Sequence, residues 1–232
     1  MVSQPPIDAG RRALLLAAGG SVGGLALAAC SPSSAPVALS TRHHPVAVAA
    51  PHSDPGAAAV TAASPYQGDA RIVAMAAALE NLVIATYAAG LRAAKAGRLG
   101  RVPAAVTSFA TAAMAQHQDH ANGWNAVLSS SRLAPIADAP LSIAAPLTAQ
   151  LARVHDATGL ARLALRLESM ALATYIGAAE DVSDTTWIAT AASIAPVEAQ
   201  HAAILRLLLG EPPVAASTPT SNGGCTAARL TV

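Results

Sequence analysis

Three glutamates stand in surroundings where a carboxylate is costly. The chain has five glutamates in all, and Glu80, Glu168 and Glu198 lie in the middle of long apolar stretches. A buried carboxylate is tolerated only where an opposite charge or a hydrogen-bond donor offsets the loss of water. These glutamates therefore predict a buried polar site whose other members come from elsewhere in the chain.

Two of these glutamates belong to an internal repeat. The segments Leu79–Tyr87 (LENLVIATY) and Leu167–Tyr175 (LESMALATY) share Leu, Glu, Ala, Thr and Tyr at matching positions. In a helix, a residue seven positions further on points within about 20° of the starting direction. Each glutamate therefore shares an apolar stripe with its tyrosine. For Tyr87 and Tyr175 we expect core packing with a hydrogen-bonded hydroxyl, or a role beside a metal.

Partners for these carboxylates are expected on two further segments. Glu198 and His201, in Glu-Ala-Gln-His, project from one helix face at a spacing that lets both reach one metal ion. His117 and His120, in His-Gln-Asp-His, stand at the comparable place in an earlier segment. Asp119 is an alternative donor, although on a helix it points about 100° away from His120.

Long helices are needed to position these residues, and the sequence predicts four. No segment alternates with a period of two, Ala is abundant, and aromatic residues make up only 3% of the chain. Such a composition favours closely packed helices over a sheet. The expected helices run from about Asp69 to Ala96, Pro103 to Leu128, Thr158 to Asp181 and Asp184 to Gly210.

Capping residues and prolines mark the ends of these helices. Asp69 is expected as an N-cap and Gly210 as a C-terminal stop. Pro196, inside the last helix, predicts a kink or bulge. Residues 129–156 contain three prolines and predict a long connection, with a short helix around Thr148–Val154.

Together these segments resemble the ferritin-like domains of exported bacterial lipoproteins. In di-iron and di-manganese carboxylate proteins of that type, two helices each supply a Glu, and the other two each supply a Glu-x-x-His pair. Glu80 precedes the pair His117/His120, and Glu168 precedes Glu198, so the order matches over about residues 70–210. The resemblance implies an all-α, ferritin-like four-helix bundle with a long crossover between the second and third helices.

The resemblance also implies a metal centre in the bundle core. Non-haem iron, as one ion or a pair, is expected first, and manganese or zinc is an alternative. The implied ligands come from all four helices and are Glu80, His117, His120, Glu168, Glu198 and His201.

One position departs from the family's pattern. His117 stands where a glutamate is expected, and a neutral imidazole has one lone pair, so it cannot bridge two ions as a carboxylate does. Three carboxylates also offset less of the charge of two divalent ions than four would. A bound hydroxide, a single ion or a different metal would each resolve this. A buried polar network that holds the helices in register without metal is the remaining alternative.

The first 30 residues have the features of an export signal. Arg11 and Arg12 precede an uncharged stretch, Ala13–Ala29, which is short for a membrane span. The arginine pair resembles a twin-arginine signal, without the Phe or Lys of the usual consensus. Leu27–Cys30 (LAAC) resembles a lipobox, which implies a lipid on Cys30 and anchoring at the extracytoplasmic face of the cell membrane. A secreted protein cut nearby and an uncleaved anchor are the alternatives.

The remaining segments predict the domain boundaries. Residues 31–65 are rich in Ala, Pro and Ser and predict a flexible linker. Residues 211–232 predict a disordered tail, so the folded unit is expected at residues 66–210. Cys225, in that tail, is expected to be incidental or open to pairing with another chain.

Charge and organisation limit the function classes. The net charge of +1 at pH 7 gives no electrostatic reason to expect nucleic acid as a partner. A homodimer is compatible with the sequence. A self-assembling iron-storage shell is not expected, because the chain has a long linker and a tail. Three hypotheses follow: a metal-dependent redox protein that reacts with oxygen or peroxide, a metal-binding or metal-delivery lipoprotein without turnover, and a metal-free bundle that acts as an interaction module of the cell envelope.

Overall fold

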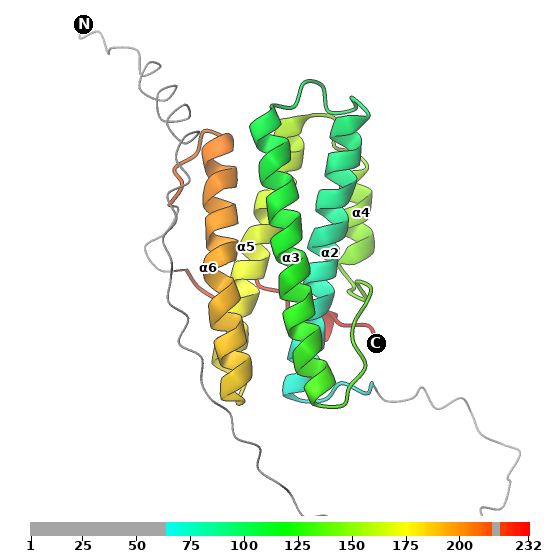
Figure 1. The fold of residues 1–232 in the computed structure, drawn as a ribbon, viewed down its shortest axis with the longest axis vertical. Helices are drawn as coiled ribbons and strands as arrows, with labels where there is room; N and C mark the ends of the chain where they lie inside the picture. The colour runs from blue at the N-terminus through cyan, green and yellow to red at the C-terminus, as the bar shows by residue number, and fades with distance from the viewer. Residues whose placement is uncertain (1–63, 215–218) are drawn as a thin grey trace, which may run out of the picture. The chain divides into compact units, whose positions relative to one another are not determined.

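The described part of the chain is helical. A computed structural model describes residues 64–214 and 219–232, and in these residues it contains helices and no strand. The long helices α2 (Asp69–Lys95), α3 (Ala104–Ser130), α5 (Ala157–Asp181) and α6 (Thr185–Leu208) lie side by side in one bundle (Figure 1). The predicted all-α four-helix bundle is confirmed, with each helix end within a few residues of its expected place.

The connectivity is that of two helical hairpins. Helix α2 packs most extensively on α3, and α5 on α6. Between the hairpins runs the predicted crossover, which carries the short helix α4 (Ala144–Leu151). This helix begins earlier than the predicted Thr148–Val154. Pro146 lies in its first turn, where the missing backbone N–H costs no helical hydrogen bond.

Aspartates organise the helix starts, although not all as expected. The side chain of Asp156 caps α5 by accepting the backbone N–H of Gly159 at 2.6 Å, and Asp184 caps α6 in the same manner. Asp69 is not the N-cap of α2; it lies in the first turn. Its carboxylate instead accepts the backbone N–H and the hydroxyl of Ser183, at 2.9 and 2.6 Å. This contact ties the start of α2 to the turn between α5 and α6.

Helix α6 runs unbroken through Pro196. Proline cannot donate to the carbonyl four residues earlier, which here belongs to Ala192. Both residues are exposed, so water can satisfy that carbonyl. Gly210 follows the helix with a φ of 76°, a conformation that favours glycine and ends helices.

Helix α2 forms the centre of the core. Ala74, Ala76, Ala77 and Ala78 have no exposed surface, and their small side chains let the neighbouring helices approach closely. By length and composition α2 could cross a membrane, but 67% of its apolar window is buried in the bundle. Such burial is typical of the core helix of a globular bundle.

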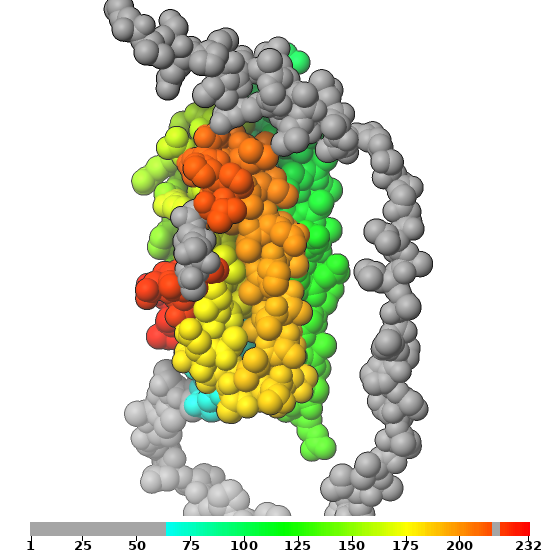
Figure 2. Space-filling view, turned by 90° about the vertical axis from the view of Figure 1, so that its left-hand side faces the viewer, coloured from blue at the N-terminus to red at the C-terminus, as the bar shows by residue number. Residues whose placement is uncertain are grey.

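Residues 219–232, which the sequence predicts to be part of a disordered tail, pack on the bundle instead. Leu230 is buried and forms an isolated antiparallel bridge with Leu141 of the crossover. Arg71 of α2 donates to the carbonyl of Leu230 at 2.8 Å. The backbone N–H of Cys225 donates to the hydroxyl of Thr174 on α5 at 2.7 Å. Figure 2 shows this segment in red beside α5.

A close backbone approach holds this segment in place. A Cβ on Gly224 would lie 2.8 Å from the backbone nitrogen of Thr174 and 2.9 Å from the carbonyl carbon of Ala173. Only glycine fits there without a shift. Cys225, expected to be incidental or open to pairing with another chain, is buried, and burial raises the pKa of its thiol to about 11.

The N-terminal predictions concern residues that the structure does not describe. The export signal (residues 1–30), the lipid attachment at Cys30 and all but the last two residues of the linker lie outside the described residues.

Candidate metal centre

The six predicted ligands converge in the middle of the bundle. Each projects inward from the helix expected to carry it. These helices are α2 for Glu80, α3 for His117 and His120, α5 for Glu168, and α6 for Glu198 and His201. Five of them are buried, and the side chain of His120 is only 11% exposed. They form two groups that share members. The α2-side group is Glu80, His117, His120 and Glu198, and the α5-side group is His117, Glu168, Glu198 and His201.

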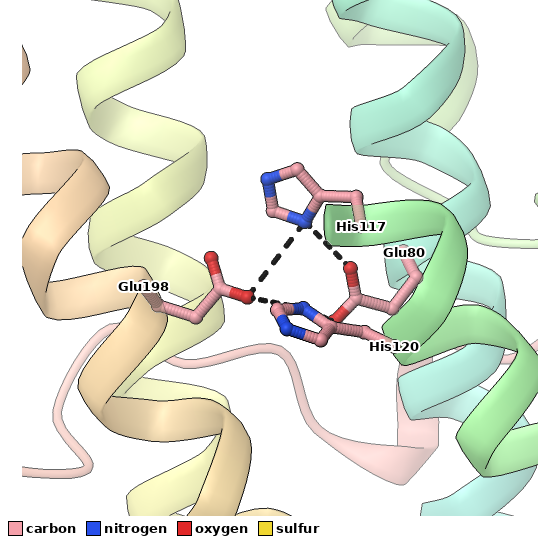
Figure 3. Close-up of side chains that lie close together, drawn as sticks. All are labelled: Glu80, His117, His120 and Glu198. Atoms are coloured by element: carbon pink, nitrogen blue, oxygen red, sulfur yellow. Dashed lines mark hydrogen bonds and ion pairs between the residues drawn. The ribbon is translucent and has the colours of Figure 1, made fainter. Parts of the chain in front are cut away.

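The α2-side group is drawn in Figure 3. Nδ1 of His117 lies 2.7 Å from Oε2 of Glu80 and 3.7 Å from Oε1 of Glu198. Nδ1 of His120 lies 2.9 Å from the same oxygen of Glu198 and 3.6 Å from Oε1 of Glu80. Two imidazoles and two carboxylates from three helices thus face one another.

In the α5-side group, the contacts of Glu168 with His117 and of His201 with Glu198 involve the other ring nitrogen and the other carboxylate oxygen of the shared residues. Nε2 of His117 lies 3.2 Å from Oε1 of Glu168. Nδ1 of His201 lies 3.4 Å from Oε2 of Glu168 and 3.6 Å from Oε2 of Glu198. One ring and one carboxylate therefore present a separate atom to each group.

The repeated tyrosines connect the hairpins. Tyr87 of α2 donates its hydroxyl hydrogen to Oε1 of Glu168 on α5. Tyr175 of α5 donates to Oε1 of Glu80 on α2. The expected hydrogen-bonded hydroxyls are confirmed. Burial and the neighbouring carboxylates raise the pKa of both phenols well above the ordinary value, so both remain donors at neutral pH.

Gln116 is a neighbour of the centre that the sequence did not single out. Its Oε1 lies 2.7 Å from Nε2 of His201. An amide oxygen only accepts, so with this amide orientation Nε2 carries a hydrogen. In a neutral ring this leaves the Nδ1 lone pair directed at Glu168 and Glu198. Gln116 is exposed, and no periodicity distinguishes it from other surface glutamines.

Contacts with histidines govern the ionisation of Glu80 and Glu168, the two glutamates that each belong to only one group. Burial alone would raise the pKa of Glu80, but the hydrogen bond from His117 and the positive charge of His117 and His120 outweigh it and lower that pKa. The pKa of Glu168 is lowered in the same way by His117 and His201. The pKa of Glu198 is raised, because burial and the nearby charge of Glu80 outweigh its histidine contacts.

The histidines respond in the opposite sense. Burial disfavours their charged forms, but hydrogen bonds that His117 donates to the carboxylates of Glu168 and Glu80 raise its pKa to about 11. Contacts with Glu198 and Glu80 raise the pKa of His120 to about 9. The pKa of His201 is raised as well. Without metal, the centre thus holds protons on its imidazoles, which offset the carboxylates.

The donor atoms fit a bound cation. Five buried atoms of the centre have no partner in hydrogen-bond geometry: Nδ1 of His120, Nδ1 of His201, Oε2 of Glu168 and both oxygens of Glu198. Each such atom costs about 1–3 kcal/mol, and native proteins keep few of them. The distances between facing atoms of this set, 2.9 to 3.6 Å, suit ligands of one ion, since two atoms bound tetrahedrally at zinc lie about 3.4 Å apart.

The remaining candidate donor does not take part. Asp119 is exposed, as its position one residue before His120 on the helix predicts.

An apolar cavity lies next to the centre, towards the end of α2. It is lined by residues of α2, α3 and α5, including Gly90, Phe109 and Leu160, and by Tyr87. The ring of Phe109 meets the ring of His201 edge-on at 5.9 Å. The wall between cavity and centre is therefore made of the same side chains that contact the ligands.

Comparison with known proteins identifies the fold. A model of the ferritin-like domain matches residues 68–211, more than half of the chain. No curated protein and no solved structure matches the chain significantly. The matched residues start one position before α2 and end after α6, so they include the whole bundle and all six converging side chains. The chain belongs to the ferritin-like domain family.

Proposed function

We propose that this protein binds one or two divalent transition-metal ions in its bundle core, with iron as the first candidate and manganese or zinc as alternatives. The observation that carries the proposal is the set of five buried polar atoms that face one another without hydrogen-bond partners. A cation among them would replace the protons held by the histidines and would satisfy each atom.

The side chains around the centre have separate roles in this proposal. The carboxylates of Glu80 and Glu168 supply charge, and each has one oxygen fixed by a tyrosine hydroxyl from the other hairpin. This fixes their orientation before an ion arrives. Gln116 would fix the ring of His201 with Nδ1 towards the centre.

A redox function is the finer part of the proposal. Iron bound here would supply one-electron chemistry towards oxygen or peroxide. The apolar cavity beside Tyr87 and Phe109 supports this assignment, because dioxygen is small and uncharged and favours apolar surroundings. The bundle would exclude bulk water from the centre, since four of the ligands have no exposed surface.

For the cellular location, we propose export and anchoring by a lipid on Cys30, at the extracytoplasmic face of the cell membrane. The support is the arginine pair followed by the short apolar stretch and LAAC at residues 27–30. Mass spectrometry of the mature N-terminus tests this proposal. Cys30→Ser should move the protein from the membrane fraction to the soluble fraction, and an unchanged distribution would contradict the lipid anchor.

Metal binding is tested on the purified full-length chain. His43, His44 and His52 are replaced by Ala throughout, so that the histidines before the bundle do not bind metal. After titration with Fe(II) under argon, elemental analysis should find one or two ions per chain. Glu198→Ala should lose at least one. Glu180→Ala is the matched control, because Glu180 is an exposed glutamate on α5.

The second candidate function is a metal-free interaction module of the cell envelope. His117 in place of a bridging carboxylate favours it, because its ring can offset Glu80 and Glu168 without metal. Under this alternative the protein binds no Fe(II) or Zn(II), and exchanging His120 and His201 for Leu leaves stability unchanged or increased. Oxygen or peroxide consumption by the iron-loaded protein separates the redox function from metal binding or delivery without turnover.

A further inference from the structure

We infer, on the basis of the metal binding proposed above, that His117 bridges two metal ions as an imidazolate. Its Nδ1 binds the ion of the α2-side group, and its Nε2 binds the ion of the α5-side group. The site is then dinuclear, with an imidazole ring in the place of a bridging carboxylate.

The placement of the ring supports this assignment. Nδ1 lies 2.7 Å from Glu80, and Nε2 lies 3.2 Å from Glu168. A histidine that binds one ion usually donates its other N–H to a single acceptor that orients it. Here Nε2 contacts Oε1 of Glu168, and Glu168 belongs with Glu198 and His201 to one group of candidate ligands, so an ion on this side of the ring would find further donors beside that carboxylate.

Glu198 divides its atoms in the same manner. Its Oε1 lies 2.9 Å from Nδ1 of His120, and its Oε2 lies 3.6 Å from Nδ1 of His201. Neither oxygen has a partner in hydrogen-bond geometry. The carboxylate of Glu198 therefore forms a second bridge beside His117, and each ion receives two shared and two private ligands.

Deprotonation of the His117 ring balances the charge of the proposed site. When both nitrogens bind an ion, the last N–H proton of His117 passes to the solvent buffer. The ring then has two lone pairs and one negative charge. Three carboxylates and one imidazolate carry −4 in total, which offsets the +4 of two divalent ions. A site without solvent requires such neutrality, and neither a fourth carboxylate nor a hydroxide is needed.

The surrounding rings keep His117 in the bridging position. Tyr87 stacks on it, with ring centroids 5.7 Å apart and planes inclined by 29°. The ring of His120 meets it edge-on at 5.7 Å, and the ring of His201 lies at 5.2 Å. The imidazole is thus enclosed and cannot turn one nitrogen towards water.

Copper(II) provides the test, because two Cu(II) ions joined by an imidazolate are magnetically coupled. The full-length chain with His43, His44 and His52 replaced by Ala is titrated with Cu(II). We expect two ions per chain and a coupled electron paramagnetic resonance spectrum with a half-field line. His117→Ala should lose the coupling and retain at most one tightly bound ion. The matched control is His155→Ala, at an exposed histidine, which should behave as the parent chain.

Small-molecule rescue separates bridging from simple ligation. In the cavity of His117→Ala, added imidazole should restore the second ion and the half-field line. Added 1-methylimidazole should restore neither, because its methyl group blocks one of the two nitrogens.

The remaining outcomes are distinguishable. A parent chain with one Cu(II), or with two uncoupled ions, overturns the bridge but leaves metal binding in place. Equal rescue of His117→Ala by imidazole and by 1-methylimidazole also overturns the bridge. A chain that binds none of Cu(II), Fe(II), Mn(II) and Zn(II) refutes the proposed function itself. If His117→Ala does not fold, the stoichiometry and spectrum of the parent chain still decide.

Discussion

The hydroxyl of Tyr87 on α2 donates to Glu168 on α5 and not to the glutamate of its own helix. The second copy of the repeat reverses the relationship, since Tyr175 donates to Glu80. Two equivalent hydrogen bonds therefore cross between the hairpins at the level of the centre. Each fixes one oxygen of a candidate ligand.

Removal of a tyrosine hydroxyl should destabilise the metal-free protein. Tyr87→Phe removes one of the two donors to Oε1 of Glu168 and leaves only Nε2 of His117, and a hydrogen bond to a charged group contributes about 1.5–3 kcal/mol to the free energy of unfolding. Urea denaturation of the metal-free protein measures this. A double-mutant cycle with Glu168→Gln should show coupling between the two residues; additive effects would mean that the hydrogen bond contributes nothing.

The contact between Gln116 and His201 should strengthen metal binding without direct ligation. Gln116→Leu removes the acceptor of the Nε2 hydrogen, and loss of such orienting partners weakens metal affinity about 10–100-fold. Competition with a zinc chelator measures the change. Gln118→Leu, at an exposed glutamine of the same helix that pairs with Asn122, is the control. Equal losses in both variants would contradict the orienting role.

The metal-free protein should lose stability in alkaline solution. The folded state raises the pKa of His120 to about 9, so its charge stabilises the fold fully below the ordinary histidine pKa of about 6.5. This contribution is lost as the pH rises through 9, because Glu198 and Glu80 then lose a positive partner. Urea midpoints at pH 7 and 9.5 measure it. For His120→Gln, we expect stability to fall less between pH 7 and 9.5. An equal fall in both proteins would refute the role of His120.

The packed C-terminal segment should protect Cys225. In a Cys30→Ser background, the thiol should react slowly with a disulfide reagent at pH 8, because it is buried and its pKa is about 11. Gly224→Ala should accelerate the reaction at least several-fold, since the new Cβ would meet the backbone of α5. Gly123→Ala, which has open space, should not. A fast reaction in the parent chain would mean that the tail is detached.

The ligand positions were predictable because their spacing is a local property. Glu198 and His201 share a helix face whatever the tertiary structure, and the repeat placed Glu80 and Glu168 on equivalent stripes. The partner of each tyrosine was not predictable, because Tyr87 could have bonded within its own helix. Only the docking of the hairpins decides it.

Contacts without a periodic signal escaped the sequence. The tail has the composition of a disordered segment, yet Gly224 fits against α5 and Arg71 binds the carbonyl of Leu230. These contacts join residues far apart in the chain and depend on backbone atoms that every sequence has. Gln116 escaped for a similar reason, since its role depends on where His201 is placed by another helix.

Each hairpin carries half of the centre. The first supplies one glutamate and two histidines, and the second supplies two glutamates and one histidine. A fragment with only one hairpin would therefore lack half of the ligands, and ion capture must follow the docking of both. An ion that binds there adds its affinity to the association of the two halves, so chelation should loosen the bundle along the seam between them and not within either pair of helices.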